Sequence, residues 1–158
     1  MFKELTRKNK QISNEKFIEI LKTETRGVLS VNGENGYPYG MPMNHYYCEK
    51  TNKIYFHSGK TGYRLDCLKQ NNKASFCVYT KGYKDENDWA FNVESVIVFG
   101  EIKIIEDEEV IKNVTTKLSH KFTNDDEYIN NEIKNYLKAT LLLELTPLHI
   151  CGKKVKES

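Results

Sequence analysis

The feature that most limits the fold of this chain is a series of strand-like segments separated by very short turns. Segments rich in aromatic and β-branched residues and bounded by Asn, Gly and Thr predict β-strands, and three of them follow one another directly: Gly27–Val31, Tyr37–Cys48 and Lys53–His57. A parallel connection needs a dozen or more residues, so we expect these strands to pair antiparallel. Pro38 and Pro42 cannot donate hydrogen bonds to a neighbouring strand, so the second strand is expected at a sheet edge or with a bulge.

The rest of the chain adds helices and further strands. Apolar periodicity and capping signals, with Ser13 as the expected cap of the first helix and Asn124 as that of the last, predict helices over Ser13–Thr23, Tyr63–Gln70, Glu106–Lys121 and Asn124–Tyr136. The same patterns predict strands over Ala74–Thr80, Ser95–Ile105 and Thr140–Leu145. The polar stretch Gly82–Asn92 is expected to be a long loop. A mainly antiparallel sheet hides its edges best when it closes wholly or partly into a barrel, with the helices outside. The expected class is α+β, in a single domain over residues 1–158.

Composition and charge narrow the class of protein. The 24 Lys and Arg residues nearly balance 22 Asp and Glu, and a net charge of +2 does not indicate a nucleic-acid partner. Basic residues gather at Lys3–Lys10 and Lys153–Lys156, which we interpret as solvated tails, with an anionic ligand as the alternative. No apolar run reaches the roughly 20 residues of a membrane span, and no signal peptide is visible, so we expect a cytoplasmic protein without a membrane partner. The four cysteines form no CxxC pair, and no metal-ligand spacing is visible, so no metal site is predicted.

The segment Ile54–Arg64 carries the strongest local signal for a binding site. A predicted strand ends, a glycine-containing loop follows, and a helix begins. Free backbone N–H groups at a helix start, with hydroxyls and cations beside them, form a phosphate site, and this segment supplies Ser58, Lys60, Thr61 and Arg64. It is not a P-loop, since that motif needs glycine where Ile54 stands. A bare solvated turn remains the alternative for this segment alone.

Three nearby features give weaker signals. His57, at the end of a strand, is either a residue satisfied by one hydrogen bond or part of a site. Pro42–Tyr46 combines a proline-interrupted strand with amide and aromatic groups, so its backbone could hydrogen-bond a planar heterocycle, or it could be a simple bulge. Trp89 is either a stacking lid or a packed anchor of its loop. No nucleophile–base pair supports hydrolytic catalysis.

Taken together, these residues resemble the flavin-binding split-barrel superfamily, which includes the pyridoxamine phosphate oxidases. Within it they are most similar to the 5-nitroimidazole-resistance (nitroimidazole reductase) proteins. The most specific part is Phe56-His57-Ser58 followed by Gly62-x-Arg64. The matching segments cover nearly the whole chain: Met1–Lys8, Gly27–Leu29, Tyr37–Pro42, Lys53–Ser58, Ser95–Gly100 and His149–Lys153.

The resemblance implies a six-stranded split β-barrel, a homodimer, and one FMN in each of two clefts between the subunits. By position in the family pattern, the FMN phosphate would be held by Ser58, Lys60 and Arg64, with Thr61 beside them. The isoalloxazine would be lined by Met43, Asn44, His45 and Tyr46, largely through backbone contacts. Further contacts carried over in the same way are Phe56, Ser95, Val96 and Lys153. Cys151 stands where the family has the threonine of a C-terminal Thr-Gly-Lys, which puts a hydroxyl contact there in doubt. His57 is implied as the catalytic residue, orienting or protonating the substrate.

The activity that follows from this resemblance is that of an FMN-dependent oxidoreductase. It would reduce a small aromatic substrate, a 5-nitroimidazole among the candidates, with NADH or NADPH as the expected donor. The flavin supplies the electron chemistry, which explains why no catalytic triad is visible. One alternative is a non-catalytic split barrel that binds FMN or haem. Another is an RNA-binding small barrel that uses the two basic ends.

Overall fold

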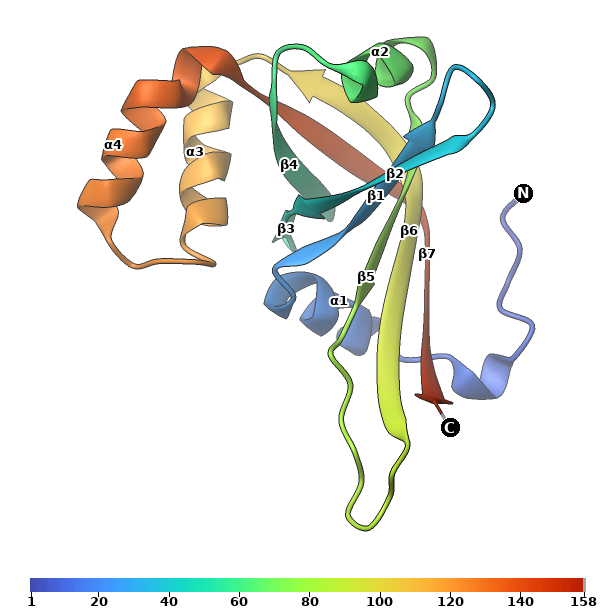
Figure 1. The fold of residues 1–158 in the computed structure, drawn as a ribbon. Coiled ribbons are helices and arrows are strands. Elements are labelled where there is room, and N and C mark those ends of the chain that lie inside the picture. The colour runs from blue at the N-terminus through green and yellow to red at the C-terminus, as the bar shows by residue number, and fades with distance from the viewer. Residues whose placement is uncertain (158) are drawn as a thin grey trace.

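The computed structural model describes residues 1–157, and Figure 1 shows them as a curled antiparallel sheet flanked by helices. Within these residues the sheet has seven strands in the order β2-β1-β5-β6-β7-β4-β3, and every neighbouring pair is antiparallel. The predicted α+β class and the antiparallel half-barrel are confirmed, with seven strands instead of six. The strands are β1 (Arg26–Asn32), β2 (Pro38–Asn44), β3 (Tyr46–Cys48), β4 (Lys53–Gly59), β5 (Lys73–Tyr79), β6 (Phe91–Ile105) and β7 (Thr140–Glu157).

The additional strand arises at His45, which divides the predicted strand Tyr37–Cys48 into β2 and β3. The His45 side chain turns into the core and is 0% exposed. Its Nε2 lies 2.8 Å from the carbonyl oxygen of Leu21, and its ring packs edge-on against Phe76. β2 and β3 form opposite edges of the sheet although they are adjacent in the chain. The chain therefore crosses from one edge to the other at His45, and the sheet curls upon itself (Figure 1).

The strand that contains the two prolines, β2, lies at a sheet edge, as the sequence predicted. It pairs only with β1, in a register that places Pro42 opposite Val28 and Pro38 opposite Asn32. A missing N–H group is tolerated on an edge strand because one side of that strand has no partner. The outer side of β2 is consequently free to border a groove.

The two longest strands, β6 and β7, run well beyond their predicted limits. β6 begins four residues earlier than expected, and β7 continues twelve residues further, to Glu157. Pro147 would ordinarily end a strand, but the register shifts opposite Gly100, and this irregularity accommodates the proline. The C-terminal lysines, interpreted from the sequence as a solvated tail, therefore belong to a paired strand.

Four α-helices flank the sheet over the described residues: α1 (Asn14–Thr23), α2 (Tyr63–Gln70), α3 (Glu108–Ser119) and α4 (Asp126–Tyr136), with two short 3₁₀ helices, η1 (Lys8–Lys10) and η2 (Leu137–Ala139). The Ser13 side chain caps α1, as predicted. The cap of α4 is Asp125 and not the expected Asn124, since the Asp125 carboxylate accepts a hydrogen bond from the Tyr128 N–H at 2.9 Å. Among residues 1–157, no helix has the length and apolar character needed to cross a membrane.

Two apolar clusters hold the helices against the sheet. The larger fills the concave side of the sheet beneath α1 and α2 and includes the fully buried Phe56, Phe76 and Leu143. The smaller packs Ile111 of α3 against Leu142 of β7, with neighbouring aromatic residues of β3 and β4. The α3–α4 pair is thereby fixed beside β4, at the edge of the sheet opposite β2 (Figure 1).

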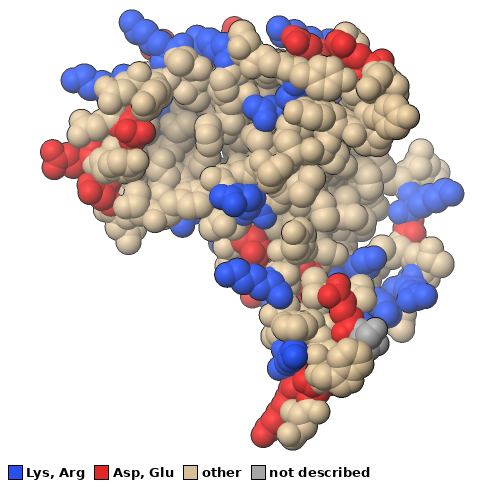
Figure 2. All heavy atoms as spheres, in the orientation of Figure 1, with Lys and Arg blue, Asp and Glu red and all other residues tan. Residues whose placement is uncertain are grey.

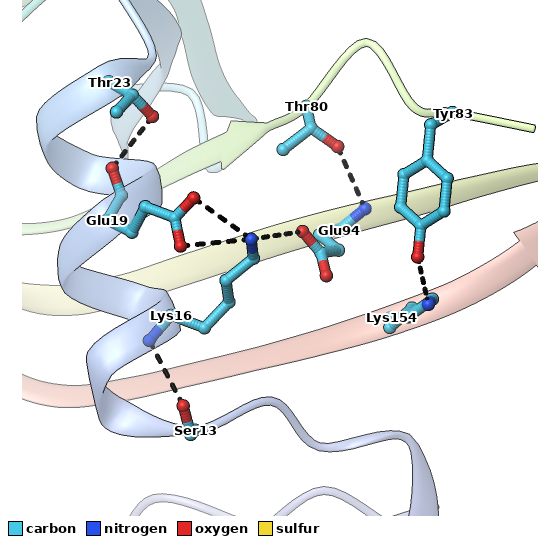
Figure 3. A network of polar contacts seen from close by, with 8 residues as sticks. All are labelled: Ser13, Lys16, Glu19, Thr23, Thr80, Tyr83, Glu94 and Lys154. Atoms are coloured by element: carbon cyan, nitrogen blue, oxygen red, sulfur yellow. Dashed lines mark hydrogen bonds and ion pairs between the residues drawn. The ribbon is translucent and has the colours of Figure 1, made fainter.

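A polar network joins α1 to the long strands at the end of the sheet away from α2 (Figure 3). The Lys16 ammonium lies 3.1 Å from the Glu19 carboxylate and 3.4 Å from that of Glu94 on β6. The Thr80 hydroxyl accepts a hydrogen bond from the Glu94 N–H at 3.1 Å. These contacts fix the helix where the chain leaves β5 for the predicted loop Gly82–Asn92.

Candidate functional site

A groove runs between β2 and β4, and we call it the seam groove. Its volume is about 420 Å³, and its lining residues are Arg26, Pro42, Met43, Asn44, His57, Ser58, Gly59 and Arg64. β2 and β4 are not neighbours in the sheet, so no ladder of backbone hydrogen bonds closes the space between them. The structure thus brings together five residues that the sequence proposed as a binding set: Met43, Asn44, His57, Ser58 and Arg64.

Arg64 gives the seam groove an uncompensated positive charge. One guanidinium nitrogen donates a hydrogen bond to the Ser58 hydroxyl at 2.7 Å, and another lies 3.1 Å from the Met43 sulfur and 3.5 Å from that of Met41. Its Nε is buried without a hydrogen-bond partner, and no carboxylate pairs with Arg64 among residues 1–157. Burial lowers the pKa of Arg64 from its usual value. Because thioethers are weak acceptors, this guanidinium is held in place but not neutralised, which favours an anionic ligand.

The loop after β4 leaves its backbone open beside Arg64. A Cβ added at Gly59 would have no atom within 4 Å, so the fold itself does not require glycine there. Gly62 has φ +129° and caps α2 without a side chain. The N–H groups of the first turn of α2 therefore have no side-chain acceptor at the cap. Lys60 and Thr61 are exposed on this loop, so all four residues of the predicted phosphate site lie within one short segment.

His57 and Asn44 supply neutral polar groups at one end of the seam groove. The Asn44 side-chain oxygen accepts a hydrogen bond from the Arg26 Nε at 2.9 Å, and the amide nitrogen of Asn44 donates no hydrogen bond within residues 1–157. Partial desolvation lowers the pKa of His57, whose side chain is still exposed, and the nearby Arg64 charge lowers the pKa further. Both effects favour the uncharged imidazole, which can donate one hydrogen bond and accept another.

A second cavity opens from the same two residues, and we call it the helical pocket. It lies between the α3–α4 pair and the sheet and has a volume of about 440 Å³. Asn44 and His57 line both this pocket and the seam groove, so the two spaces are contiguous. Its other walls come from α3, α4, η2 and the segments that join them: Ile111, Thr115, Leu118, Ser119, Phe122, Glu132, Ile133, Tyr136, Leu137, Ala139 and Thr140.

Three predicted contact residues lie next to the groove in sequence but outside it in space. The His45 side chain is buried. The backbone N–H of His45 donates a hydrogen bond to the Thr25 carbonyl, and its backbone carbonyl accepts one from the Lys121 ammonium at 2.9 Å. The His45 ring is enclosed by the core, and the backbone N–H and carbonyl of this residue already make hydrogen bonds within the chain. Phe56 is fully buried in the core, and the Tyr46 ring stacks on Tyr55 beneath α3. None of the three residues lines the seam groove.

A further group of predicted residues lies at the other end of the sheet. Ser95 pairs with Lys153 across β6 and β7, and Val96 is buried in the core. Thr140 is the β7 residue opposite Gly59, and Lys153 lies thirteen residues beyond it, or roughly 40 Å along an extended strand. One chain therefore does not bring these residues to the seam groove. Trp89 is also remote from the groove, on the exposed β5–β6 connection, with 72% of its surface accessible.

Two parts of the site were not predicted from the sequence. Arg26 begins β1 and meets the groove because its register partner is Asn44. In the sequence, only the position of Arg26 directly before a predicted strand could have pointed to a role in the site. Many basic residues of the chain have similar positions. The helical pocket is built from α3 and α4, whose apolar stripes indicate only that each helix packs on something.

With the geometry in place, the sequence can be compared with known families. The family model for pyridoxamine 5'-phosphate oxidase matches residues 13–154, which is most of the chain. The chain belongs to the pyridoxamine 5'-phosphate oxidase family. No curated protein sequence matches it.

Solved structures share the fold over nearly the whole chain. A protein from Bacteroides thetaiotaomicron, named as a candidate 5-nitroimidazole antibiotic resistance protein, superposes with a TM-score of 0.77 at 19% identity, covering 93% of this chain and 87% of that one. A conserved hypothetical protein from Mycobacterium tuberculosis gives 0.80 at 14% identity, covering 95% and 89%. The FAD- and haem-binding protein of Mycobacterium smegmatis gives 0.72 at 19% identity, covering 94% and 74%. The likeness to these three proteins establishes the split-barrel fold.

Proposed function

We propose that this protein binds FMN in the seam groove and uses it to reduce a small aromatic substrate, with NADH or NADPH as electron donor. The observation that carries the proposal is the Arg64 guanidinium, which is fixed by Ser58 and two methionine sulfurs but has no anionic partner among the described residues. A phosphate monoester supplies the missing charge and can accept hydrogen bonds from an arginine in bidentate geometry. Family membership supports a phosphate-bearing flavin as the ligand.

The residues present fit such a cofactor. Arg64, Ser58 and the open loop at Gly59 suit a phosphate, and the exposed Lys60 is a second cation on the same loop, next to Gly59. The Asn44 amide has two N–H groups, so one can bind an acceptor at the edge of a heterocyclic ring and one remains over. A bound flavin supplies hydride and electron transfer, and the protein supplies binding, orientation and electrostatics.

The role of this chain's own residues in the reaction follows from their positions. Arg64 and Ser58 anchor the charged end of the ligand, and Asn44, held by Arg26, orients the other end. The neutral His57 orients the substrate and passes a solvent proton to it. For a nitroaromatic substrate, one NAD(P)H and one proton reduce the nitro group to a nitroso group and release one water molecule.

We propose further that the functional unit is a homodimer. Arg64 and the groove lie at one end of the sheet, whereas Ser95 and Lys153 lie at the other, so a single chain holds two separate parts of the predicted site. A second copy that places its Ser95–Lys153 end against the seam groove would complete two equivalent sites. A closed two-fold arrangement is the commonest one for soluble oligomers.

The absorption spectrum of freshly purified protein is the first test. We expect a yellow protein with two flavin bands, release of FMN on heating, and bleaching of both bands by NADH or NADPH under anaerobic conditions. A Soret band would instead indicate haem binding. This alternative is supported by the structural likeness to the FAD- and haem-binding protein. A colourless protein that also fails to bind added FMN would refute the flavin site.

A substitution at His57 then separates catalysis from binding. In His57→Ala, we expect FMN to remain bound while kcat falls at least tenfold, because general acid catalysis by a positioned side chain is typically worth more than that. His57→Gln, which keeps a hydrogen-bonding group but cannot shuttle a proton, is expected to retain substrate KM more closely than His57→Ala. Loss of FMN from His57→Ala would instead assign this residue to cofactor binding.

A further inference from the structure

We propose that the helical pocket is the binding site for the aromatic substrate, and that it takes a small, flat, uncharged ring bearing a hydrogen-bond acceptor such as a nitro or carbonyl group. Naming this ligand a substrate rests on the proposed flavin function. The binding site itself does not, because the pocket is formed by α3, α4 and β4 whatever occupies the seam groove.

The size and walls of the pocket suit an aromatic ring. Its volume of about 440 Å³ lies within the range of roughly 300–1,000 Å³ typical of small-molecule sites. Ile111 and Leu118 of α3 form a buried apolar floor, and Ile133 and Leu137 close the side towards α4. On the face shown in Figure 2, charged side chains gather on the outer side of the α3–α4 pair, and the hollow between this pair and the sheet is mainly uncharged.

Two hydroxyl groups in the pocket wall are already used within the protein. The Thr115 hydroxyl donates to the Ile111 carbonyl at 2.7 Å, and the Thr140 hydroxyl donates to the Tyr136 carbonyl at 2.8 Å. These side chains therefore present mainly their methyl groups to a ligand. A polar molecule would lose hydrogen bonds to water on entering this part of the pocket, which favours an apolar ring.

Two of the unpaired polar side chains lie where the pocket meets the seam groove. Over residues 1–157, neither the Asn44 amide nitrogen nor the His57 ring makes a hydrogen bond, and both side chains border the two spaces. An acceptor group on the ring, pointing to this junction, would be bound by the Asn44 N–H and the neutral His57. This orientation places the reducible group next to the seam groove, where the proposed chemistry takes place.

The charge near the pocket selects against anionic rings. Glu132 of α4 contributes to the wall and has no ion-pair partner in the part of the chain that the structure describes. A carboxylate on the ligand would share the pocket with this like charge and would lose hydration against the apolar walls. We therefore expect nitrobenzene to bind and benzoate, of similar size, to bind at least tenfold more weakly.

Methyl-resolved NMR on the full chain tests the site directly. With 13C-labelled Ile and Leu methyl groups, titration with nitrobenzene is expected to shift Ile111, Leu118, Ile133 and Leu137, with and without FMN bound. Toluene, which lacks the acceptor, is expected to bind more weakly than nitrobenzene. Equal binding of nitrobenzene and benzoate, or shifts confined to methyl groups elsewhere, would overturn the proposal.

A variant that fills the pocket provides an independent test. Ala139 is exposed and lines the pocket, so Ala139→Phe adds bulk without removing core packing. It is expected to weaken nitrobenzene binding, and to raise KM for nitroaromatic reduction, at least tenfold while FMN affinity stays unchanged. The matched control is Asn135→Phe, which adds the same ring to an exposed position of α4 outside the pocket.

The two proposals can fail separately in these experiments. Nitrobenzene shifts in a protein that refuses FMN would refute the flavin function but support the pocket. Active, FMN-loaded enzyme whose KM is the same in Ala139→Phe and Asn135→Phe would refute the pocket and leave the flavin function standing. Shifts of the pocket methyl groups by FMN itself, with loss of FMN from Ala139→Phe, would assign the helical pocket to the cofactor and overturn this inference.

Discussion

At the scale of single residues, hydrogen bonds hold the Arg64 guanidinium in place, but its positive charge has no negatively charged partner among residues 1–157. Its partners among residues 1–157 are a hydroxyl and two thioethers, none of which carries a negative charge. Without an anion this arrangement costs folding free energy, because a partly buried guanidinium without a counter-ion loses hydration and forms only weak interactions in its place. We therefore expect the side chain to contribute more to ligand binding than to folding.

Replacing this arginine should weaken cofactor binding specifically. A charge-assisted phosphate contact is worth roughly 1.5–3 kcal/mol, so Arg64→Ala is expected to raise the Kd for FMN by about 10- to 100-fold. Quenching of flavin fluorescence during titration gives this Kd. Arg7→Ala, which removes an exposed arginine outside the seam groove, is the matched control. Equal affinity in both variants would show that the phosphate binds elsewhere.

His45 illustrates a residue whose effect is on stability. Burial lowers its pKa to about 3, with a smaller effect from the nearby Lys121 charge. The unfolded chain, in which histidine titrates near 6.5, then binds more protons than the folded chain between about pH 6.5 and 3. The free energy of unfolding should fall as pH decreases through this interval, by up to about 1.4 kcal/mol per pH unit from this group.

The variant His45→Gln tests this pH dependence, since its amide can still donate to the Leu21 carbonyl but cannot become protonated. Urea unfolding between pH 7 and 5 is expected to show a shallower loss of stability in this variant than in the wild type. His120→Gln, at an exposed histidine, should follow the wild type. If His45→Gln and the wild type lose stability in parallel, the buried imidazole is not the group responsible.

At the scale of elements, the pairing of β6 with β7 depends on a glycine at the register shift. A Cβ at Gly100 would lie 2.2 Å from the Thr146 carbonyl oxygen, which is backbone and cannot move aside cheaply. This close approach lets β7 pass Pro147 and continue to Glu157 without leaving the sheet. The C-terminal half of β7 therefore depends on a single small residue in the facing strand.

Gly100→Ala should accordingly destabilise the fold by about 1–3 kcal/mol, the usual cost of forcing extra volume into a packed site. The control is Gly59→Ala, whose Cβ would meet nothing within 4 Å and should change stability by no more than about 0.5 kcal/mol. Chemical denaturation measures both. Gly59→Ala should nevertheless weaken FMN binding, because its methyl group occupies the open side of the loop. Unchanged stability in Gly100→Ala would mean that the register shift can relax.

At the scale of the whole molecule, the two parts of the proposed site lie at opposite ends of the sheet. The proposed site therefore needs residues from two chains. The seam groove and α2 lie at one end, and the Ser95–Lys153 pair lies at the other, near the C-terminal end of β7 (Figure 1). A monomer could hold the phosphate through Arg64 but would leave one side of the groove open. Complete sites require that the two ends meet between subunits.

Mixing two inactive variants tests this arrangement. Arg64→Ala and Lys153→Ala homodimers should each bind FMN weakly at both sites, whereas their heterodimer combines both intact halves in one of its two sites. We expect the refolded mixture to recover part of the flavin bound per chain, measured by absorbance after gel filtration. A mixture of Arg64→Ala with Ser58→Ala, which alters the same half of the site twice, should recover none. Equal recovery in both mixtures, or a monomeric protein by light scattering, would refute the shared site.

Local signals in the sequence determined the individual elements and one half of the site. Proline placed β2 at an edge, serine capped α1, and short turns required antiparallel pairing. The residues predicted as a phosphate site, Ser58 to Arg64, are close in sequence and share one strand–loop–helix unit, which brings Ser58 and Arg64 into one groove. For the same reason Met43 and Asn44, on one short strand, could be named in advance. That a phosphate binds in this groove stays a prediction.

Only the tertiary structure decided what those elements face. His45 and Phe56 turn into the core, whereas their neighbours Asn44 and His57 line the groove, because the curl of the sheet fixes which side chains are enclosed. Arg26 and the α3 and α4 residues of the helical pocket belong to segments that are far from the phosphate loop in sequence. β7 extends beyond the strand that its sequence predicts, because it pairs with β6 along its length. Local preferences depend on a few adjacent residues, but register, curvature and the cavities between layers arise from contacts between distant ones.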